Sequence, residues 1–381
     1  MLNKIKSMKR PPVRVIVGLV VLTIIAVAVI TIPAGRNGGL ELIAEEPLAT
    51  PIPLTPPPTP TPPPIPTPEP ILSPPPGMAI NPVTGLYISE QTALRRPFAV
   101  VYNNESRAMP QSGLFDADII YEVLAEGVTT RLVAIFSDFD ASVIGPVRST
   151  RYYFNYLAQD HNAVLVHHGG SPLAYNAIRS RGLAHIDGMQ FDGTVFWRDA
   201  WRRQNRGLEH SSMTSSENLL SHAEGRFTME MAAPNAAMFD FFDEPTNPAP
   251  ENIANTVTIT FAGSNRNIFT FNEHTGLYYK YFFGNPHMDE YTDRQIAVAN
   301  VIVQITGIRH IPGDTDGRRN VDLIGEGRGY LITSGGYVPI TWAKADAASP
   351  TRWYDTDGNR LTINRGQTWV NIVNTQPEFE Q

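Results

Sequence analysis

The stretch IGPVRSTRYYF, residues 144–154, combines residue types that could bind an anion. A Gly-Pro turn precedes Arg148 and Arg151, and Ser149 lies between the two arginines. If a helix begins near Ser149, its first N–H groups and the positive end of its dipole point outward. Arginine adds forked, permanently charged donors that suit carboxylate or phosphate. These residues therefore predict an anion-binding cradle.

The stretch HHGGSP, residues 167–172, predicts a second side of the same cradle. Two glycines after His167 and His168 allow the backbone to approach a ligand closely. Ser171 is a suitable N-cap for another helix. Arg131 is expected on a nearby strand, where its guanidinium would add positive charge to the site.

Ion pairing is the alternative interpretation of these arginines. Glu122 lies within an apolar strand pattern, and a buried glutamate needs a partner. Arg131 or Arg148 could be that partner, in a pair that only supports the fold. We therefore keep Glu122 among the candidate ligand-binding residues, and both interpretations stay open at this point.

The histidines and serines give weaker signals for other chemistry. His167 and His168 are adjacent on an expected strand, so they point to opposite faces, and no HExxH spacing occurs. The sequence GGSP is not the strained G-x-S-x-G elbow of a hydrolase, and a capping role already explains Ser171. We predict no catalytic residue, no metal site and no cofactor.

The amino-terminal 36 residues carry six basic side chains and no acid. Among them, Val13–Ile32 is an apolar run of 20 residues, which at about 1.5 Å per residue spans a hydrocarbon core of roughly 30 Å. A secretory signal has a shorter apolar region of about 7–15 residues, so a retained transmembrane anchor is predicted over a cleaved signal. The basic flank places residues 1–12 in the cytoplasm and the following chain outside the cell membrane.

The residues after the anchor begin with a proline-rich stalk, which we assign to 33–79. Between positions 47 and 76, 16 of 30 residues are proline. Proline excludes helix and sheet, so this segment is predicted as polyproline II, about 3.1 Å per residue and roughly 90 Å long. There is no cysteine for a disulfide or a lipid anchor, and the chain without its tail has a net charge of −13 (24 − 37), which argues against nucleic acid as a partner.

Two further domains are predicted, which makes the fold class α+β. Residues 80–245 alternate strand and helix patterns, including a hairpin over 117–139 and a helix over 171–182, and indicate a mixed α/β layered domain. The helix begins with Ser-Pro and ends at a glycine, as helices commonly do. A proline-rich break then precedes residues 246–381, whose short alternating runs and Gly, Asn and Asp turns predict a β-rich domain.

Several of these segments resemble a known family. They are RPFAVVYNNESRAMPQSGLFDADIIYEVLAEGVTTRLVAIF, IGPVRSTRYYF and VHHGGSP, followed by GYVPITW and GQTWVNIV near the carboxyl end. Together they resemble the YerB-like bacterial extracytoplasmic proteins, whose two domains have no established function. The resemblance implies an α/β domain followed by a β-rich one and implies no activity. Many relatives resemble lipoproteins, whereas this chain lacks cysteine and is predicted to use a helix instead.

Three functions agree with these observations. The first is a membrane-anchored binding protein of the cell envelope that recognises an anionic component or a cell-wall protein through the arginine-rich cleft. The second is an envelope enzyme that transfers glycopolymer from a lipid-linked phosphate, because the arrangement loosely resembles LytR-type transferases. The third is a non-catalytic cell-wall scaffold. We favour the binding protein, and the segment FWRDAWRRQNRGLEH, residues 196–210, is expected to border its cleft.

Overall fold

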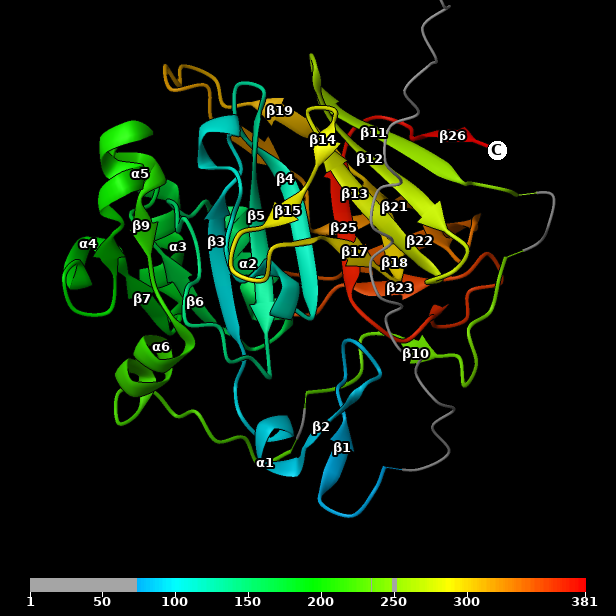
Figure 1. The fold of residues 1–381 in the computed structure, drawn as a ribbon, viewed down its shortest axis with the longest axis horizontal. Coiled ribbons are helices and arrows are strands. Elements are labelled where there is room, and N and C mark those ends of the chain that lie inside the picture. Colours follow the sequence, from blue (N-terminus) through cyan, green and yellow to red (C-terminus); the bar gives the residue numbers. More distant parts are fainter. Residues whose placement is uncertain (1–73, 234, 249–251) are drawn as a thin grey trace, which may run out of the picture. The chain divides into compact units, whose positions relative to one another are not determined.

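The computed structural model describes residues 74–233, 235–248 and 252–381, which are coloured in Figure 1. The predicted cytoplasmic tail, the membrane segment Val13–Ile32 and nearly all of the predicted stalk lie outside these residues. Within the described ranges, no helix is both long enough and apolar enough to cross a membrane.

A ten-stranded sheet forms the centre of the structure. In spatial order its strands are β23 (Arg352–Tyr354), β22 (Gly336–Lys344), β21 (Gly325–Thr333), β18 (Asn300–Ile305), β25 (Thr368–Val373), β4 (Ile119–Glu126), β5 (Thr129–Phe136), β3 (Phe98–Asn103), β6 (Val164–His167) and β7 (His185–Asp187). Strand β25 lies parallel to both β4 and β18. Of these two flanking strands, β4 comes from the amino-terminal half of the sequence and β18 from the carboxyl-terminal half.

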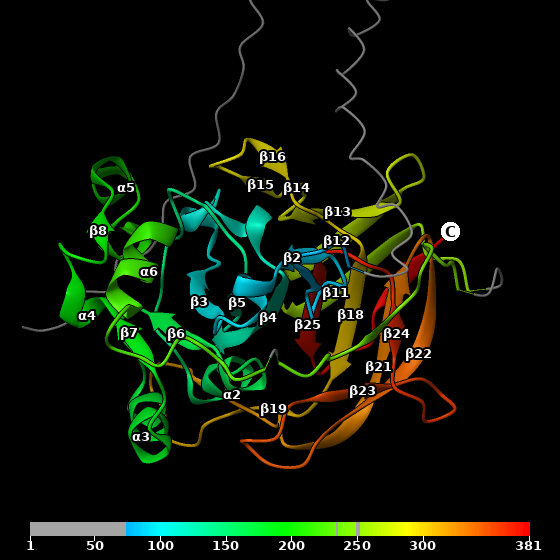
Figure 2. The same cartoon turned by 90° about the horizontal axis from the view of Figure 1, so that it is seen from below.

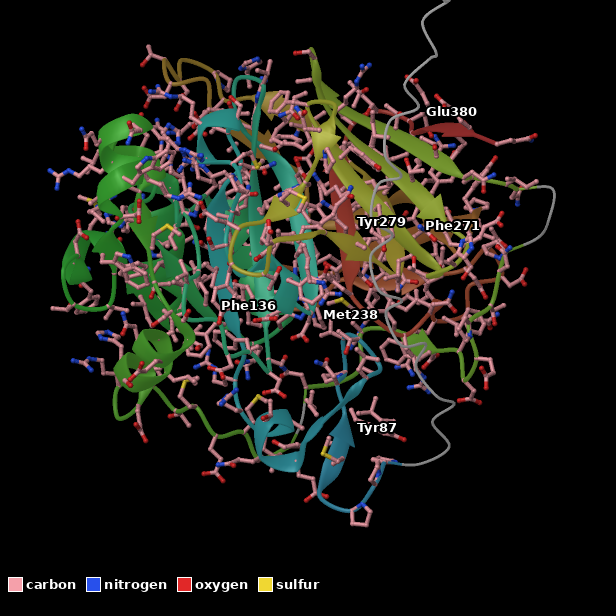
Figure 3. The ribbon with its side chains drawn as sticks, in the orientation of Figure 1. Tyr87, Phe136, Met238, Phe271, Tyr279 and Glu380 are labelled. Carbon is pink, nitrogen blue, oxygen red and sulfur yellow. The ribbon has the colours of Figure 1, made fainter. Side chains whose placement is uncertain are left out.

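A second sheet of six strands contains only residues from the carboxyl-terminal half. It comprises β14 (Asn285–Pro286), β13 (Leu277–Phe282), β12 (Asn265–Asn272), β11 (Thr256–Ala262) and β26 (Glu378–Glu380), with β17 (Ala297–Val298) beside β13. Burial alternates along β11 and β13, as expected for strands with one covered face. Figure 3 shows Phe271 and Tyr279 on the neighbouring strands β12 and β13, and Glu380 on the edge strand β26.

The helices are short, and all of them come from the amino-terminal part of the described chain. They are α1 (Glu90–Ala93), α2 (Tyr152–Asp160), α3 (Pro172–Arg181), α4 (Gly188–Phe191), α5 (Ala200–Asn205) and α6 (Ser216–Ala223), with the 3-10 turns η1 (Ser106–Ala108), η2 (Leu114–Asp116) and η3 (Leu208–His210). Figure 1 shows α3 to α6 gathered at the β6–β7 end of the central sheet.

Small two-stranded ladders complete the structure. The pairs are β1 (Met78–Ile80) with β2 (Tyr87–Ser89), β8 (Trp197–Arg198) with β9 (Ser212–Met213), β10 (Asp240–Phe241) with β24 (Thr362–Ile363), β15 (Met288–Asp289) with β16 (Arg294–Gln295), and β19 (Ile308–His310) with β20 (Arg319–Val321). The β8–β9 ladder matters most for the site below, because it holds Arg198 opposite Ser212.

The strands in the middle of the central sheet, from β18 to β6, are buried on both faces, which explains their continuous apolar runs. Along β3, Phe98, Val100 and Tyr102 join one apolar core, and Ala99 and Val101 join the other. The first core lies against the second sheet and the second lies against α2 and α3. Figure 2 shows this layering, with α2 below β4 and β5, α3 below β6 and β7, and β12 and β13 on the opposite side of the sheet.

The structure confirms the α+β class and the β-rich carboxyl-terminal part. The predicted hairpin is formed by β4 and β5, with Gly127 at φ 52° in the turn between them. Helix α3 has Ser171 as N-cap, Pro172 in its first turn and Gly182 at its end with φ 60°. The central sheet takes strands from both sides of the predicted boundary at 245/246, so that boundary does not separate two sheets and stays a prediction.

Candidate functional site

The segment around Arg148 is extended, and our expectation of a helix starting near Ser149 is wrong. Helix α2 begins at Tyr152, after Arg151, which caps it without a side-chain hydrogen bond. The backbone N–H of Arg148 donates to Val101 O at 2.8 Å, and the N–H of His168 donates to Arg148 O at 3.0 Å. Residues 147–150 therefore join the ends of β3 and β6 instead of starting a helix, and the N–H of Arg148 is not available to a ligand.

Arg131 and Arg151 are held by protein oxygens. Both guanidinium groups form ion pairs with Glu126, and Arg131 also donates to Ser149 O. Arg151 also donates to Thr150 O at 2.7 Å. Burial lowers the pKa of Arg131 to about 9 and that of Arg151 to about 10. These two arginines therefore hold the backbone of Ser149 and Thr150 in place. Because two guanidinium groups share the single carboxylate of Glu126, this cluster keeps a net positive charge.

Glu122 belongs to a separate buried network. Its partner is Lys280 on β13, whose Nζ lies 3.8 Å from Oε2, and not Arg131 or Arg148 as the ion-pair interpretation suggested. Side chains of the central and second sheets donate to its two oxygens: Asn104 and Thr130 at 2.8 Å, Asn267 at 2.6 Å and Trp369 at 3.2 Å. Glu122 is fully buried between the two sheets, so it has no path to a ligand.

His167 and Ser171 also have structural partners. His167 is fully buried, with Nδ1 2.8 Å from Gly169 O and Nε2 3.1 Å from Nδ1 of His185. The hydroxyl of Ser171 accepts from the N–H of Ala174 at 3.2 Å, as expected of an N-cap. The two adjacent histidines do face different surroundings, as predicted, and among the described residues no three acidic or histidine side chains cluster as metal ligands would.

A pocket lies where the residues from the two predicted motifs meet, and we call it the Arg148 pocket. Its volume is about 210 Å³, and its polar lining comes from Arg148, Ser149, His168, Arg198 and Glu209. The segment 196–210 thus borders the pocket, as predicted. The structure brings Arg148, Ser149 and His168 together at this pocket and places the other five predicted site residues outside its lining.

Arg148 is the distinctive side chain of this pocket. The closest ion-pair contact of its guanidinium is Glu105 Oε1 at 3.9 Å, which is too far for a hydrogen bond. Its Nε is buried, and no described residue accepts a hydrogen bond from it. The side chain is 26% exposed, so the charge faces the pocket while part of the guanidinium is already removed from water. A guanidinium group that is partly buried and lacks a hydrogen-bond acceptor can form a charge-assisted hydrogen bond with an anion.

His168 is neutral and fixes the second arginine. Its Nε2 lies 2.6 Å from the Arg198 guanidinium, which can only donate, so Nδ1 carries the proton and donates to Ser212 Oγ at 2.8 Å. Burial and the Arg198 charge lower the pKa of His168. The imidazole has room because residue 188 is glycine: a Cβ there would lie 2.2 Å from Nδ1.

Arg198 and Glu209 are polar pocket residues that we did not single out in the sequence. Arg198 donates to Asp192 and to Leu208 O, each at 2.9 Å, as well as to His168. Its position in an arginine-rich segment with two tryptophans was the available signal. Because three of its five N–H groups have partners, Arg198 contributes mainly charge and rigidity to the pocket wall.

Comparison with known proteins identifies the family. The family described as "Protein of unknown function (DUF3048) N-terminal domain" matches residues 83–230, and the family of the corresponding C-terminal domain matches residues 257–370. "Putative lipoprotein YerB" of Bacillus subtilis (strain 168) is 33% identical over 296 residues, which cover 77% of this chain and 85% of that protein. This chain belongs to the DUF3048 family. The resemblance to YerB-like proteins is therefore confirmed.

A solved structure extends the DUF3048 match to three dimensions. The crystal structure of YerB from Bacillus subtilis superposes with a TM-score of 0.70 at 30% sequence identity. The superposition covers 80% of this chain and 100% of the YerB chain. The crystallised YerB chain is therefore matched along its whole length by this chain.

Proposed function

We propose that this DUF3048 protein is a membrane-associated, extracytoplasmic binding protein that holds an anionic group of an envelope component against Arg148. The observation that carries the proposal is the side chain of Arg148, which lines a pocket and makes no hydrogen bond within the described part of the chain. A buried donor without a partner costs about 1–3 kcal/mol, so the site favours a ligand that accepts hydrogen bonds.

The surroundings of Arg148 support the same preference. Arg198 adds a second guanidinium group to the pocket, where neutral His168 and an ion pair with Asp192 at 2.9 Å hold it in place. Arg131 and Arg151 lie behind Ser149 and exceed the charge of Glu126 by one unit.

The proposed location rests on the relative and on the amino-terminal sequence. The Bacillus subtilis relative is described as "Putative lipoprotein YerB", and lipoproteins are held at a membrane by their lipid. In this chain, the apolar run Val13–Ile32 would take the place of a lipid anchor, because the sequence has no cysteine to acylate. The proline-rich stalk would then hold the folded part away from the bilayer.

Inorganic phosphate is the simplest probe of the Arg148 pocket. We expect phosphate to raise the melting temperature of the full chain in detergent micelles, with a stabilisation of about 2.7 kcal/mol at a hundred times the Kd. Arg148→Ala should weaken phosphate binding by about 10- to 100-fold, because a charge-assisted hydrogen bond contributes about 1.5–3 kcal/mol. Thermal melts across a phosphate titration measure both effects.

Arg203→Ala is the matched control, because Arg203 lies on α5, is exposed, and does not line the pocket. This variant should keep the full response to phosphate. If neither phosphate nor a carboxylate such as acetate stabilises the unmodified chain, or if Arg148→Ala responds like Arg203→Ala, the proposed function is wrong.

A further inference from the structure

We infer that the ligand of the Arg148 pocket is a zwitterion, an amino acid or a peptide end whose carboxylate meets Arg148 and whose ammonium group meets Glu209. This inference rests on the proposed function and specifies its ligand. It begins from one observation: Arg148 and Glu209 line the same pocket, yet within the described part of the chain they form no ion pair with each other. Opposite charges that share a pocket without pairing fit a ligand that carries both.

The carboxylate of Glu209 is charged and open to solvent. Its side chain is 47% exposed, and its pKa is lowered by a hydrogen bond from its own backbone N–H and by the charges of Arg148 and Arg107. The nearest ionisable nitrogen is Nε2 of His210, 3.8 Å from Oε1. Burial lowers the pKa of His210, so this imidazole is neutral and does not neutralise Glu209. The carboxylate therefore keeps its charge for a cation that approaches from the pocket.

The apolar side chains of the pocket indicate what the rest of the ligand is like. Met189 and Leu208 line it and are 68% and 52% exposed. They would cover an apolar group that lies next to the two charges. An amino acid with an aliphatic side chain presents these three features together.

The size of the pocket favours a small ligand. Its volume of about 210 Å³ lies below the roughly 300–1,000 Å³ of pockets that enclose drug-sized molecules. A whole glycan or lipid chain does not fit, whereas one amino acid or the terminal residue of a peptide does. A bare phosphate would leave Glu209, Met189 and Leu208 without a partner, so phosphate is a probe of Arg148 and not the expected ligand.

Three probes separate these features: leucine, N-acetyl-leucine and inorganic phosphate. N-acetylation removes the ammonium charge and keeps the carboxylate and the side chain. By isothermal titration calorimetry on the full chain in detergent micelles, we expect leucine to bind at least 10-fold more tightly than N-acetyl-leucine. Glu209→Gln should abolish this difference, and it should bind N-acetyl-leucine and phosphate at least as tightly as before because a negative charge has been removed. Arg148→Ala should weaken all three.

The outcomes distinguish the ligand class from the proposed function. If N-acetyl-leucine binds as tightly as leucine, or if Glu209→Gln keeps the preference for leucine, the zwitterion inference is overturned, although Arg148-dependent binding of phosphate would still support the proposed function. If none of the three probes binds, both are overturned. Glu217→Gln, at an exposed position in the first turn of α6, is the control and should retain every affinity.

Discussion

Replacing Glu122 by alanine is expected to lower the free energy of unfolding by about 3–5 kcal/mol, because it leaves a buried charge without its partner. Glu122 and Lys280 are both fully buried, and three rings surround the ammonium group, the closest being Trp369 at 4.6 Å and Phe282 at 4.7 Å. Burial lowers the pKa of Lys280 to about 8 even with the glutamate present. Urea denaturation followed by tryptophan fluorescence measures the loss.

The second half of the test is a double-mutant cycle. Lys280→Met alone should also be strongly destabilising, because Glu122 then keeps four hydrogen bonds and loses its cation. The double variant should lose less than the sum of the two single losses, since it buries no unpaired charge. Glu273→Ala, at an exposed position, should change stability by less than about 0.5 kcal/mol. A loss below about 1 kcal/mol for Glu122→Ala would contradict a buried ion pair.

Acid should destabilise the protein, and buried histidines are the main reason. Burial lowers the pKa of His161 to about 3 and that of His167 to about 4, well below the value of about 6.5 in an unfolded chain. Between these values the unfolded state binds more protons, so stability is complete above pH 6.5 and is lost as the pH falls toward 4. Each of these histidines contributes about 1.4 kcal/mol per pH unit in this range.

Asp118 opposes this trend in part. Burial raises its pKa to about 6, so protonation of its carboxyl group favours the folded state as the pH falls from about 6 to 4. His161, His167 and Asp118 together should then contribute a net loss of about 2–3 kcal/mol between pH 7 and pH 5, measured by urea denaturation at each pH. His161→Gln should reduce the slope of the free energy of unfolding against pH by an amount that corresponds to nearly one bound proton. His274→Gln, at an exposed position, should leave this slope unchanged. A profile that is flat over this range would contradict the buried neutral histidines.

Local signals in the sequence were sufficient for elements whose ends are fixed by their own residues. Helix α3 follows from serine, proline and glycine at its ends, and the β4–β5 hairpin follows from two β-branched runs around a glycine. The start of α2 could not be predicted in the same way. Serine is a common N-cap residue, so Ser149 suggested a helix start. Backbone hydrogen bonds to β3 and to the end of β6, which are distant in the sequence, instead hold this segment in an extended form.

The candidate site shows the same division between local and distant information. Composition predicted an arginine-rich cleft, and Arg148, Ser149 and His168 do meet at a pocket. Which arginines would be neutralised depended on contacts across the sheets, because Glu126 pairs with Arg131 and Arg151, whereas the carboxylate nearest to Arg148 is that of Glu105 at 3.9 Å. The partner of Glu122 was missed for the same reason, since Lys280 lies on a strand of the other sheet.

The position of β25 has a consequence for how this protein is made. Residues 368–373 are synthesised after every other strand of the central sheet, yet they occupy a place between β4 and β18. Until they emerge, two long apolar edges remain open to unwanted association with other chains. Folding of the nascent protein therefore depends on residues 368–373, and a premature stop codon shortly before position 368 would remove the middle of the sheet.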